Sequence, residues 1–458
     1  MANGVVRPSW LRRGRYAWLH PRLWLRRVVL WCGAVAVGVA AIAFALSAEF
    51  ANDVHQRMVD LSPLLPFVVG PAGLALVVWI TRRFFPGTQG SGIPQTIAAL
   101  GVTDEKLRDK LLSPRVAIGK FLLTVLALFS GASVGREGPT VQIGASIMHS
   151  LGRLTRFSRI EAERGLILAG GAAGVAAAFN TPLAGVVFAI EEMSRSFESR
   201  TSGTVLTAVI VAGIVSLWWL GDYTYFGSTA AVLDGPTAWI AVLTCGVVGG
   251  FAGGAFSQVL IAFSRRGLPG RLGVYARKRP VMFAAYCGFA LAVIGTISGG
   301  STYGTGYHEA RSILEGTGEL SAAYGILKVV ATLISYVSGI PGGVFAPSLA
   351  IGAGLGDNLA ALAPYAPAGA VIVLGMVAYF AGVVQAPVTA FVIVIEMTDN
   401  HDMIVPLMAA SLLAAGCSRI VCRRPLYKAL ADQFLGKSGR KKEKVPTEAE
   451  ETPKQSAD

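Results

Sequence analysis

Residues 135–146 read GREGPTVQIGAS, and residues 343–354 read GVFAPSLAIGAG. Aligned at an offset of 208 residues, the two stretches superpose Pro139 on Pro347 and place one Ile-Gly-Ala triplet on the other. Each stretch begins with glycine and proline and continues with residues that favour a helix. The match indicates two copies of one helix start.

A second pair of stretches repeats in the same order. NTPLAGVVFAIEEM begins at Asn180 and QAPVTAFVIVIEM at Gln385, and an offset of 205 residues superposes Glu191 on Glu396. Two nearly equal offsets in the same order indicate a duplicated half. Transporters are often built from two such halves, with the substrate bound where broken helices of the halves meet.

The composition places both halves in a membrane. Apolar side chains make up 53% of the 458 residues and charged ones 15%, whereas a soluble chain is about 25% charged. The 55 glycines suit close helix packing and broken helices. We expect an all-α polytopic membrane protein of two related, inverted halves with broken and tilted helices. A disordered chain, a collagen and a soluble two-domain enzyme are excluded.

The charge pattern predicts four regions and their orientation. Seven arginines and no acid lie in the first 30 residues, directly before the apolar run Val28–Ala48. Such an arm favours the cytoplasmic side of the cell (inner) membrane, where we place both termini. Binding of nucleic acid is the disfavoured alternative, and a cleaved signal peptide conflicts with an apolar run of about 20 residues. The regions are a basic arm (1–27), a first membrane half (28–220), a second membrane half (221–430) and a helix end with a disordered cytoplasmic tail (431–458).

Metal-binding and disulfide patterns are not found in the sequence. The five cysteines are scattered and form no CxxC pair. His308 and Glu309 begin a string like HExxH, but its fifth residue is Ser312. We therefore expect no metal, no cofactor and no disulfide framework.

Three strings rich in glycine interrupt the apolar runs: GSGIP (90–94), GREGP (135–139) and GGVFAP (342–347). Proline is favoured in the first turn of a helix, where the N–H groups have no intrahelical acceptor. Several helix N-termini that converge in a membrane would form an anion site without a full positive charge. Simple helix breaks at loop ends are the alternative interpretation.

The three strings, their order and the two glutamate-containing repeats resemble the CLC family of chloride channels and chloride/proton antiporters. Together with Pro425-Leu426-Tyr427, the resemblance extends from about residue 60 to residue 430. It implies a homodimer in the lipid bilayer with one pathway in each subunit. The pair of CBS domains that many members carry is not expected, because few residues follow Tyr427.

The resemblance also implies a chloride site. The hydroxyls of Ser91 and Tyr427 and the backbone N–H groups of Val344 and Phe345 would donate to a central chloride ion. Serine at position 91 matches the chloride-selective members, whereas proline there marks a preference for nitrate. The sequence alone also allows a helix cap at Ser91 and an interfacial anchor at Tyr427.

Two glutamates are candidates for proton movement. A carboxylate among glycine-rich helix breaks costs about 3 kcal/mol at mid-membrane and is a functional candidate by default. By resemblance, Glu137 is the external gating glutamate and Glu192 the internal proton-transfer glutamate of the antiporters. A surface ion pair with Arg136 is the alternative for Glu137. For the matched residues Glu191 and Glu396 we expect a structural role such as capping.

The resulting prediction is an antiporter that exchanges chloride for protons, rather than an enzyme. A passive chloride channel, gated by voltage or pH through Glu137 alone, is the nearest alternative. An intramembrane hydrolase using Ser91 or Glu137 is remote, because position 89 is Gln and no GxSG string is formed. The retained proline of GREGP argues against the fluoride-exporting branch of the family.

Overall fold

The computed structural model describes residues 21–102, 104–154, 160–194, 199–221, 224–227, 229–233, 235–318, 320–363 and 366–439. Helices account for nearly all of the regular structure in these ranges. They are α2 (Pro21–Leu61), α3 (Pro66–Phe84), α4 (Ile93–Gly101), α5 (Glu105–Leu111), α6 (Pro114–Phe129), α7 (Glu137–Leu154), α8 (Ile160–Phe179), α9 (Pro182–Phe188), α10 (Ser199–Leu220), α11 (Trp239–Arg266), α12 (Gly270–Lys278), α13 (Pro280–Ile297), α14 (Tyr307–Leu314), α15 (Tyr324–Val337), α16 (Phe345–Leu362), α17 (Ala368–Val384), α18 (Pro387–Thr398), α19 (Ile404–Val421) and α20 (Leu426–Gly439). Seven of the described helices are long and apolar enough to cross a bilayer, so the protein is a multi-pass membrane protein.

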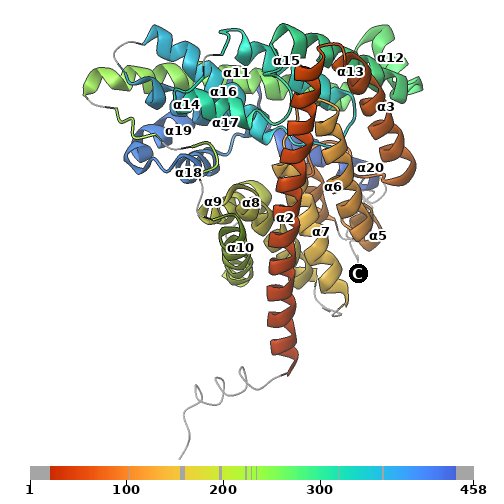
Figure 1. Ribbon diagram of the computed structural model, residues 1–458. Coiled ribbons are helices and arrows are strands. Elements are labelled where there is room, and N and C mark those ends of the chain that lie inside the picture. Colours follow the sequence, from red (N-terminus) through yellow and green to blue (C-terminus); the bar gives the residue numbers. More distant parts are fainter. Residues whose placement is uncertain are drawn as a thin grey trace, which may run out of the picture.

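The helices confirm the duplication. In the first half α8 packs against both α7 and α10, and in the second half α17 packs in the same way against α16 and α19. The long helix at the start of each half also packs in a matching way: α2 lies against α8 and α10, and α11 lies against α17 and α19. Figure 1 shows α2 running the height of the molecule beside α8, α9 and α10, with α11 and α16–α19 gathered in the upper part.

Matched glycines allow close helix crossings in each half. A methyl group on Gly352 of α16 would stand 2.7 Å from the carbonyl oxygen of Gly375 on α17. A methyl group on Gly144 of α7 would lie even closer to the carbonyl oxygen of Gly170 on α8. These glycines superpose at the same offsets of 208 and 205 residues. Small residues at a crossing bring two backbones into contact, which stabilises helix pairs in lipid.

Each half caps a helix of the other half. The carboxylate of Glu191 accepts hydrogen bonds of 3.2 and 2.6 Å from two N–H groups in the first turn of α18. The carboxylate of Glu396 accepts bonds of 3.0 and 2.6 Å from the first turn of α9. A carboxylate at a helix N-terminus satisfies N–H groups and complements the helix dipole. The predicted capping role of this pair is therefore confirmed.

Two helices extend across the borders of the regions defined from the sequence. Helix α2 starts at Pro21, within the predicted arm, and continues to Leu61, well past the apolar run that ends at Ala48. Residues 49–61 contain no glycine or proline, so nothing in them stops the helix. Helix α20 extends to Gly439 and includes the first residues of the predicted tail. Residues 1–20 and 440–458 lie outside the described residues.

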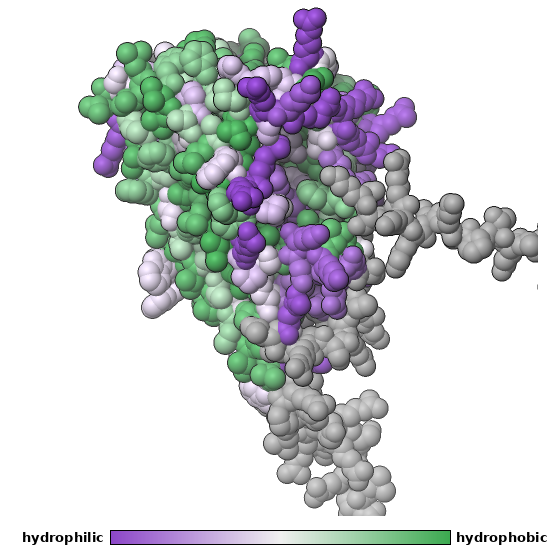
Figure 2. Space-filling view, turned by 90° about the vertical axis from the view of Figure 1, so that its right-hand side faces the viewer, coloured by the Kyte–Doolittle hydropathy of each residue, from purple (hydrophilic) through white to green (hydrophobic). Residues whose placement is uncertain are grey.

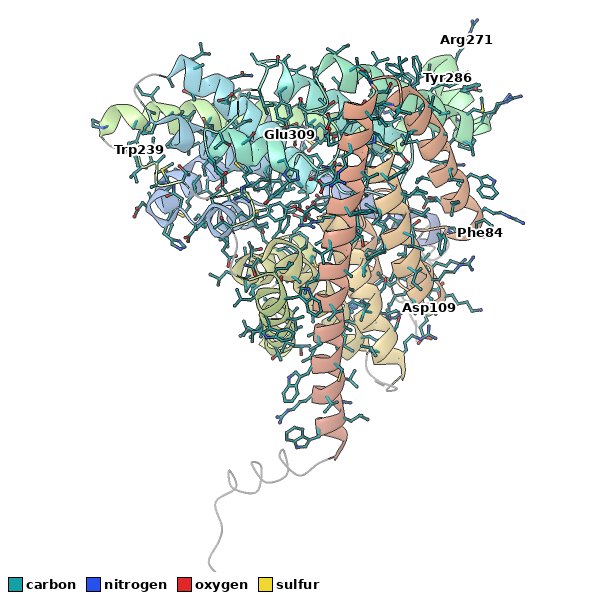
Figure 3. All side chains as sticks on the ribbon, viewed as in Figure 1. Phe84, Asp109, Trp239, Arg271, Tyr286 and Glu309 are labelled. Carbon is teal, nitrogen blue, oxygen red and sulfur yellow. The ribbon has the colours of Figure 1, made fainter. Side chains whose placement is uncertain are left out.

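The surface separates into apolar and charged parts. Figure 2 shows a broad hydrophobic surface on one side and hydrophilic residues gathered on the other. Exposed basic residues flank the ends of α3, α5, α11, α12 and α19, and include Arg82, Arg83, Lys106, Lys110, Arg265, Arg266, Arg271, Arg277, Lys278, Arg279, Arg423 and Arg424. In Figure 3, Arg271 of α12 points away from the molecule at the edge opposite Trp239, where α11 begins.

Candidate functional site

The three glycine-rich strings meet at one place through backbone hydrogen bonds. The N–H of Gly342 donates to the carbonyl oxygen of Gly90 at 3.0 Å. Gly135 and Gly343 bond each other in both directions, at 2.7 and 2.8 Å. Helices α4, α7 and α16 begin within these strings, at Ile93, Glu137 and Phe345. The prediction that each string starts a helix is confirmed, and the three N-termini converge.

Glycine is needed where these strings touch. A methyl group on Gly343 would stand 3.2 Å from both the carbonyl oxygen of Gly135 and the amide nitrogen of Gly138. A methyl group on Gly138 would collide with the Oγ of Ser91. Side chains at these positions would separate the strings. Their absence lets the backbone N–H groups of three helix starts face a common region.

Ser91 and Tyr427 supply hydroxyls to this region. Their exposed fractions are 2% and 0%, and neither hydroxyl makes a hydrogen bond within the described part of the chain. The two hydroxyls lie close enough to interact, because α20, which carries Tyr427 in its first turn, packs on α4. A buried hydroxyl without a partner costs about 1–3 kcal/mol. Two of them side by side offer donors that the protein itself does not use.

A cavity of about 410 Å³ leads to Ser91 from the basic surface. Its wall includes Arg82, Arg277 and Tyr336. Both arginines are exposed and belong to the basic residues at the ends of α3 and α12. This inner cavity therefore combines a positively charged mouth with an unbonded hydroxyl at its end.

Val344 and Phe345 form the start of α16 and are 2% and 1% exposed. The Phe345 ring packs against the rings of Phe179 and Phe380, with centroids 5.0 and 4.2 Å apart. These contacts hold the first turn of α16 in place. Its N–H groups have no intrahelical acceptor and carry the positive end of the helix dipole.

Glu137 is the first residue of α7 and is 1% exposed. Its Oε1 accepts a hydrogen bond of 3.1 Å from the hydroxyl of Tyr225. Its Oε2 has no hydrogen-bond partner among the described residues and lies beside Gly135, facing the amide of Ala346. The carboxylate is therefore not on the surface, although Arg136, next to it in sequence, interacts with it electrostatically. The carboxylate instead occupies the junction of the glycine-rich strings.

Glu192 lies in a π-helical turn, Ala189–Ser194, that follows α9. Its exposed fraction is 2%, and its carboxylate interacts electrostatically with the hydroxyl of Tyr427, as does that of Glu137. Such turns recur at functional sites. The turn directs Glu191 and Glu192, neighbours in sequence, to different surroundings, since Glu191 caps α18. All six residues predicted for the site thus lie around one buried region.

Two residues at this region were not predicted. Lys120 of α6 is fully buried, and its Nζ donates to the carbonyl oxygens of Thr88 and Gly90 at 2.8 and 2.5 Å, next to Ser91. Lys120 could have been identified from the sequence, because a lysine inside an apolar run is unusual in a membrane protein. Tyr225 lies at the start of the second half, before α11, in a stretch of sequence without a motif.

Residues 73–419 match the model of the family described as voltage gated chloride channel. The chain belongs to this family. The H(+)/Cl(-) exchange transporter ClcA of Salmonella paratyphi A is 34% identical over 386 residues, which cover 81% of this chain and 79% of ClcA. The ClcA of Salmonella typhimurium is 33% identical over the same coverage.

Solved structures of the family share the fold. A slow cyanobacterial Cl−/H+ antiporter superposes with a TM-score of 0.76 at 28% identity, covering 92% of this chain and 100% of the antiporter. A eukaryotic CLC transporter gives a TM-score of 0.73 at 22% identity, covering 89% of this chain and 74% of that protein. At that lower identity the likeness shows the fold alone.

Proposed function

We propose that this protein exchanges chloride for protons across the inner membrane. The observation that carries the proposal is the buried Glu137 carboxylate, seated where three helix N-termini converge beside two hydroxyls that bond nothing within the described chain. Both relatives named above are called H(+)/Cl(-) exchange transporters, which supports the same activity here.

A central chloride ion would take its hydrogen bonds from neutral donors. The hydroxyls of Ser91 and Tyr427 donate from one side, and the N–H groups of Val344 and Phe345 from the start of α16. Neutral donors and a helix dipole hold a halide without the strong attraction of a full cation, so the ion also leaves. The inner cavity, with Arg82 and Arg277 at its wall, supplies chloride from the basic side.

Glu137 acts as the outer gate. As a carboxylate it competes with chloride for the N–H groups at the junction, because both are anions. When it takes up a proton it loses its charge, leaves the junction and opens the outer anion position. Each release and return of the side chain then carries one proton toward or away from the outside.

Glu192 connects this gate to the inside. It is buried in the π-helical turn and interacts with the same tyrosine hydroxyl as Glu137, so it can exchange protons between the cytoplasm and the site. A buried carboxylate at this position has an energetic cost that a purely structural residue would not need. We infer that Glu192 is the internal proton-transfer residue.

The proposed setting follows the family. The protein is a homodimer with one pathway in each subunit, both termini are cytoplasmic, and its lipid-facing surface is the apolar one in Figure 2. The exposed basic residues at the helix ends fit the cytoplasmic face. No nucleic acid and no cofactor take part.

Purified protein in liposomes tests the exchange. An outward chloride gradient should drive protons uphill into the liposomes, and Glu192→Gln should stop this proton movement while chloride still flows. Chloride flow without proton movement in the wild type would instead support a passive channel. Hydrolysis of a peptide substrate that Ser91→Ala abolishes, with no anion flux, would support the hydrolase alternative.

A further inference from the structure

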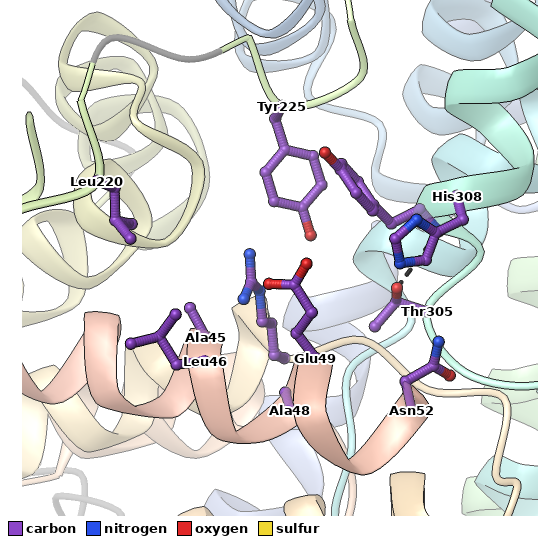
Figure 4. A pocket seen from close by; sticks show the side chains of 11 residues that line it. Ala45, Leu46, Ala48, Glu49, Asn52, Leu220, Tyr225, Thr305 and His308 are labelled. Atoms are coloured by element: carbon purple, nitrogen blue, oxygen red, sulfur yellow. Dashed lines mark hydrogen bonds between the residues drawn. The ribbon is translucent and has the colours of Figure 1, made fainter. Parts of the chain in front are cut away.

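A second cavity, of about 210 Å³, lies on the other side of Glu137. Helix α2 forms one wall with Ala45, Leu46, Ala48, Glu49 and Asn52, and Thr305, Tyr307 and His308 form the wall opposite. Figure 4 shows Glu49 pointing from α2 toward the hydroxyl end of Tyr225, whose ring projects into the cavity from the opposite side. We call this the outer cavity.

Tyr225 separates the outer cavity from Glu137. Its ring lines the cavity, whereas its hydroxyl donates to Glu137 Oε1 at 3.1 Å and the residue is 2% exposed. The ring is held by edge contacts with Phe179, Phe226 and Tyr307, whose centroids are 5.3, 5.0 and 4.9 Å away. The neighbouring backbone is also fixed, because the N–H of Phe226 donates to the carbonyl oxygen of Met397 at 3.2 Å.

We propose that Tyr225 is the latch of the gate: its hydroxyl holds the carboxylate of Glu137 at the junction, and release of this bond lets the side chain enter the outer cavity. The inference rests on the proposed function of Glu137 and assigns a positioning role to a residue outside the family's motifs in this chain. The rigid aromatic surroundings make the hydroxyl a fixed donor rather than a mobile one.

The chemistry of the bond makes the latch respond to protons. A hydroxyl donates more strongly to a charged carboxylate than to a neutral carboxylic acid. Protonation of Glu137 therefore weakens the bond at the same moment as it removes the charge that favours the junction. Tyr225 thus stabilises the closed, deprotonated gate selectively.

Other groups near Glu137 set its electrostatic surroundings. Arg136, its neighbour in sequence, and Tyr427 of α20 interact electrostatically with Glu137 itself. Glu49 of α2 and Tyr307 and His308 of α14 line the outer cavity on the other side of Tyr225. A change of Tyr225 to phenylalanine leaves all of them in place. A shift in the pH dependence of chloride efflux in this variant is therefore due to the loss of the Tyr225 hydroxyl.

The test measures chloride efflux from liposomes between pH 4.5 and 8. Loss of one hydrogen bond to a charged group changes an equilibrium about tenfold, so Tyr225→Phe should move the pH midpoint of activation up by about one unit. Efflux at pH 7.5 should rise about tenfold accordingly, with the ratio of chloride to protons unchanged. Site-specific 3-fluorotyrosine at position 225, a stronger donor, should move the midpoint down.

Tyr307→Phe is the matched control. It removes a hydroxyl from the same aromatic cluster, but within the described part of the chain that hydroxyl accepts from Arg311 at 3.1 Å rather than donating to Glu137. It should leave the midpoint unchanged, and Tyr225→Phe should have no effect when Glu137 is already replaced by glutamine. An unchanged midpoint in Tyr225→Phe, or an equal shift in Tyr307→Phe, would overturn the latch. Failure of the exchange function itself would be seen separately, as absent proton movement in the wild type.

Discussion

The two halves hold their glycine-rich loops in the same way. In the first half, buried Lys120 donates to the carbonyl oxygens of Thr88 and Gly90. In the second half, buried Lys328 donates to those of Thr302, Tyr303 and Gly304 at 3.0, 3.0 and 3.1 Å. Each lysine thus fixes a Gly-x-Gly string, GSG at 90–92 or GTG at 304–306, just before a short helix.

The residues that these matched loops present are different. Ser91 turns an unbonded hydroxyl toward the inner cavity, whereas the Thr305 oxygen accepts from the N–H of Tyr307 at 3.3 Å and lines the outer cavity. Likewise Glu137 superposes on Phe345, and Glu192 on Met397. The halves therefore share the residues that fix the backbone and differ at those to which we assign the transport chemistry.

The largest effect should follow from removing the charge of Glu137, which has no counterpart at Phe345 in the other half. Glu137→Gln should abolish uphill proton movement and leave a chloride flux that no longer depends on pH, because the neutral side chain cannot compete as an anion. Proton uptake by liposomes under a chloride gradient measures this. Phe345→Leu at the matched position keeps its backbone N–H groups and should retain coupling. Coupling that persists in Glu137→Gln would refute the gate.

The two matched lysines should contribute alike to stability but differently to chloride binding. Lys120→Met and Lys328→Met each leave buried carbonyl oxygens without a donor, so both should lower the free energy of unfolding, by about 1–3 kcal/mol for each unsatisfied oxygen. Thermal unfolding in detergent measures this loss. Only Lys120→Met should also weaken chloride binding in calorimetry, since only its loop carries Ser91. Equal loss of binding in both variants would contradict the assignment of the inner site.

The hydroxyls of the two loops should differ in their effect on chloride. Ser91→Ala removes one hydrogen bond to an anion, worth about 1.5–3 kcal/mol, and should raise the chloride Kd at least about tenfold. Thr305→Ala should change it less than about twofold, because that oxygen is bonded within the protein. Calorimetry on both variants decides the matter. Equal effects would mean that the loops are functionally equivalent.

The smallest effects should come from the residues that the halves share. Glu191→Gln and Glu396→Gln weaken equivalent caps, so each should lower stability by about 1 kcal/mol and by the same amount within error. Chloride binding should not change. Melting temperatures of the two variants provide the comparison, and a clearly unequal loss would show that the caps are not equivalent.

The sequence was enough to bring the candidate site residues together because they lie in short motifs, while their roles in transport stay a prediction. Glycine and proline mark helix starts by backbone chemistry alone. The repeat distinguishes Glu191, which has a glutamate counterpart in the other half, from Glu192, which has none. Tyr225 could not be found, since its role depends on a contact between the segment before α11 and Glu137 of α7, which are 88 positions apart in sequence. The end of α2 could not be read from the apolar run, because apolarity indicates where a helix meets lipid, whereas the helix itself continues through the more polar residues 49–61.

The reciprocal caps also bear on how the protein is made. The carboxylate of Glu396 lies 213 residues after the N–H group of α9 that it caps. At 5–20 residues per second, a ribosome needs roughly 10–40 seconds to cover that distance. Until then, the start of α9 must find other hydrogen-bond acceptors in the insertion machinery or at the lipid headgroups. The first half is therefore fully synthesised before it reaches its final structure. Its folding is completed only when Glu396 of the second half caps α9.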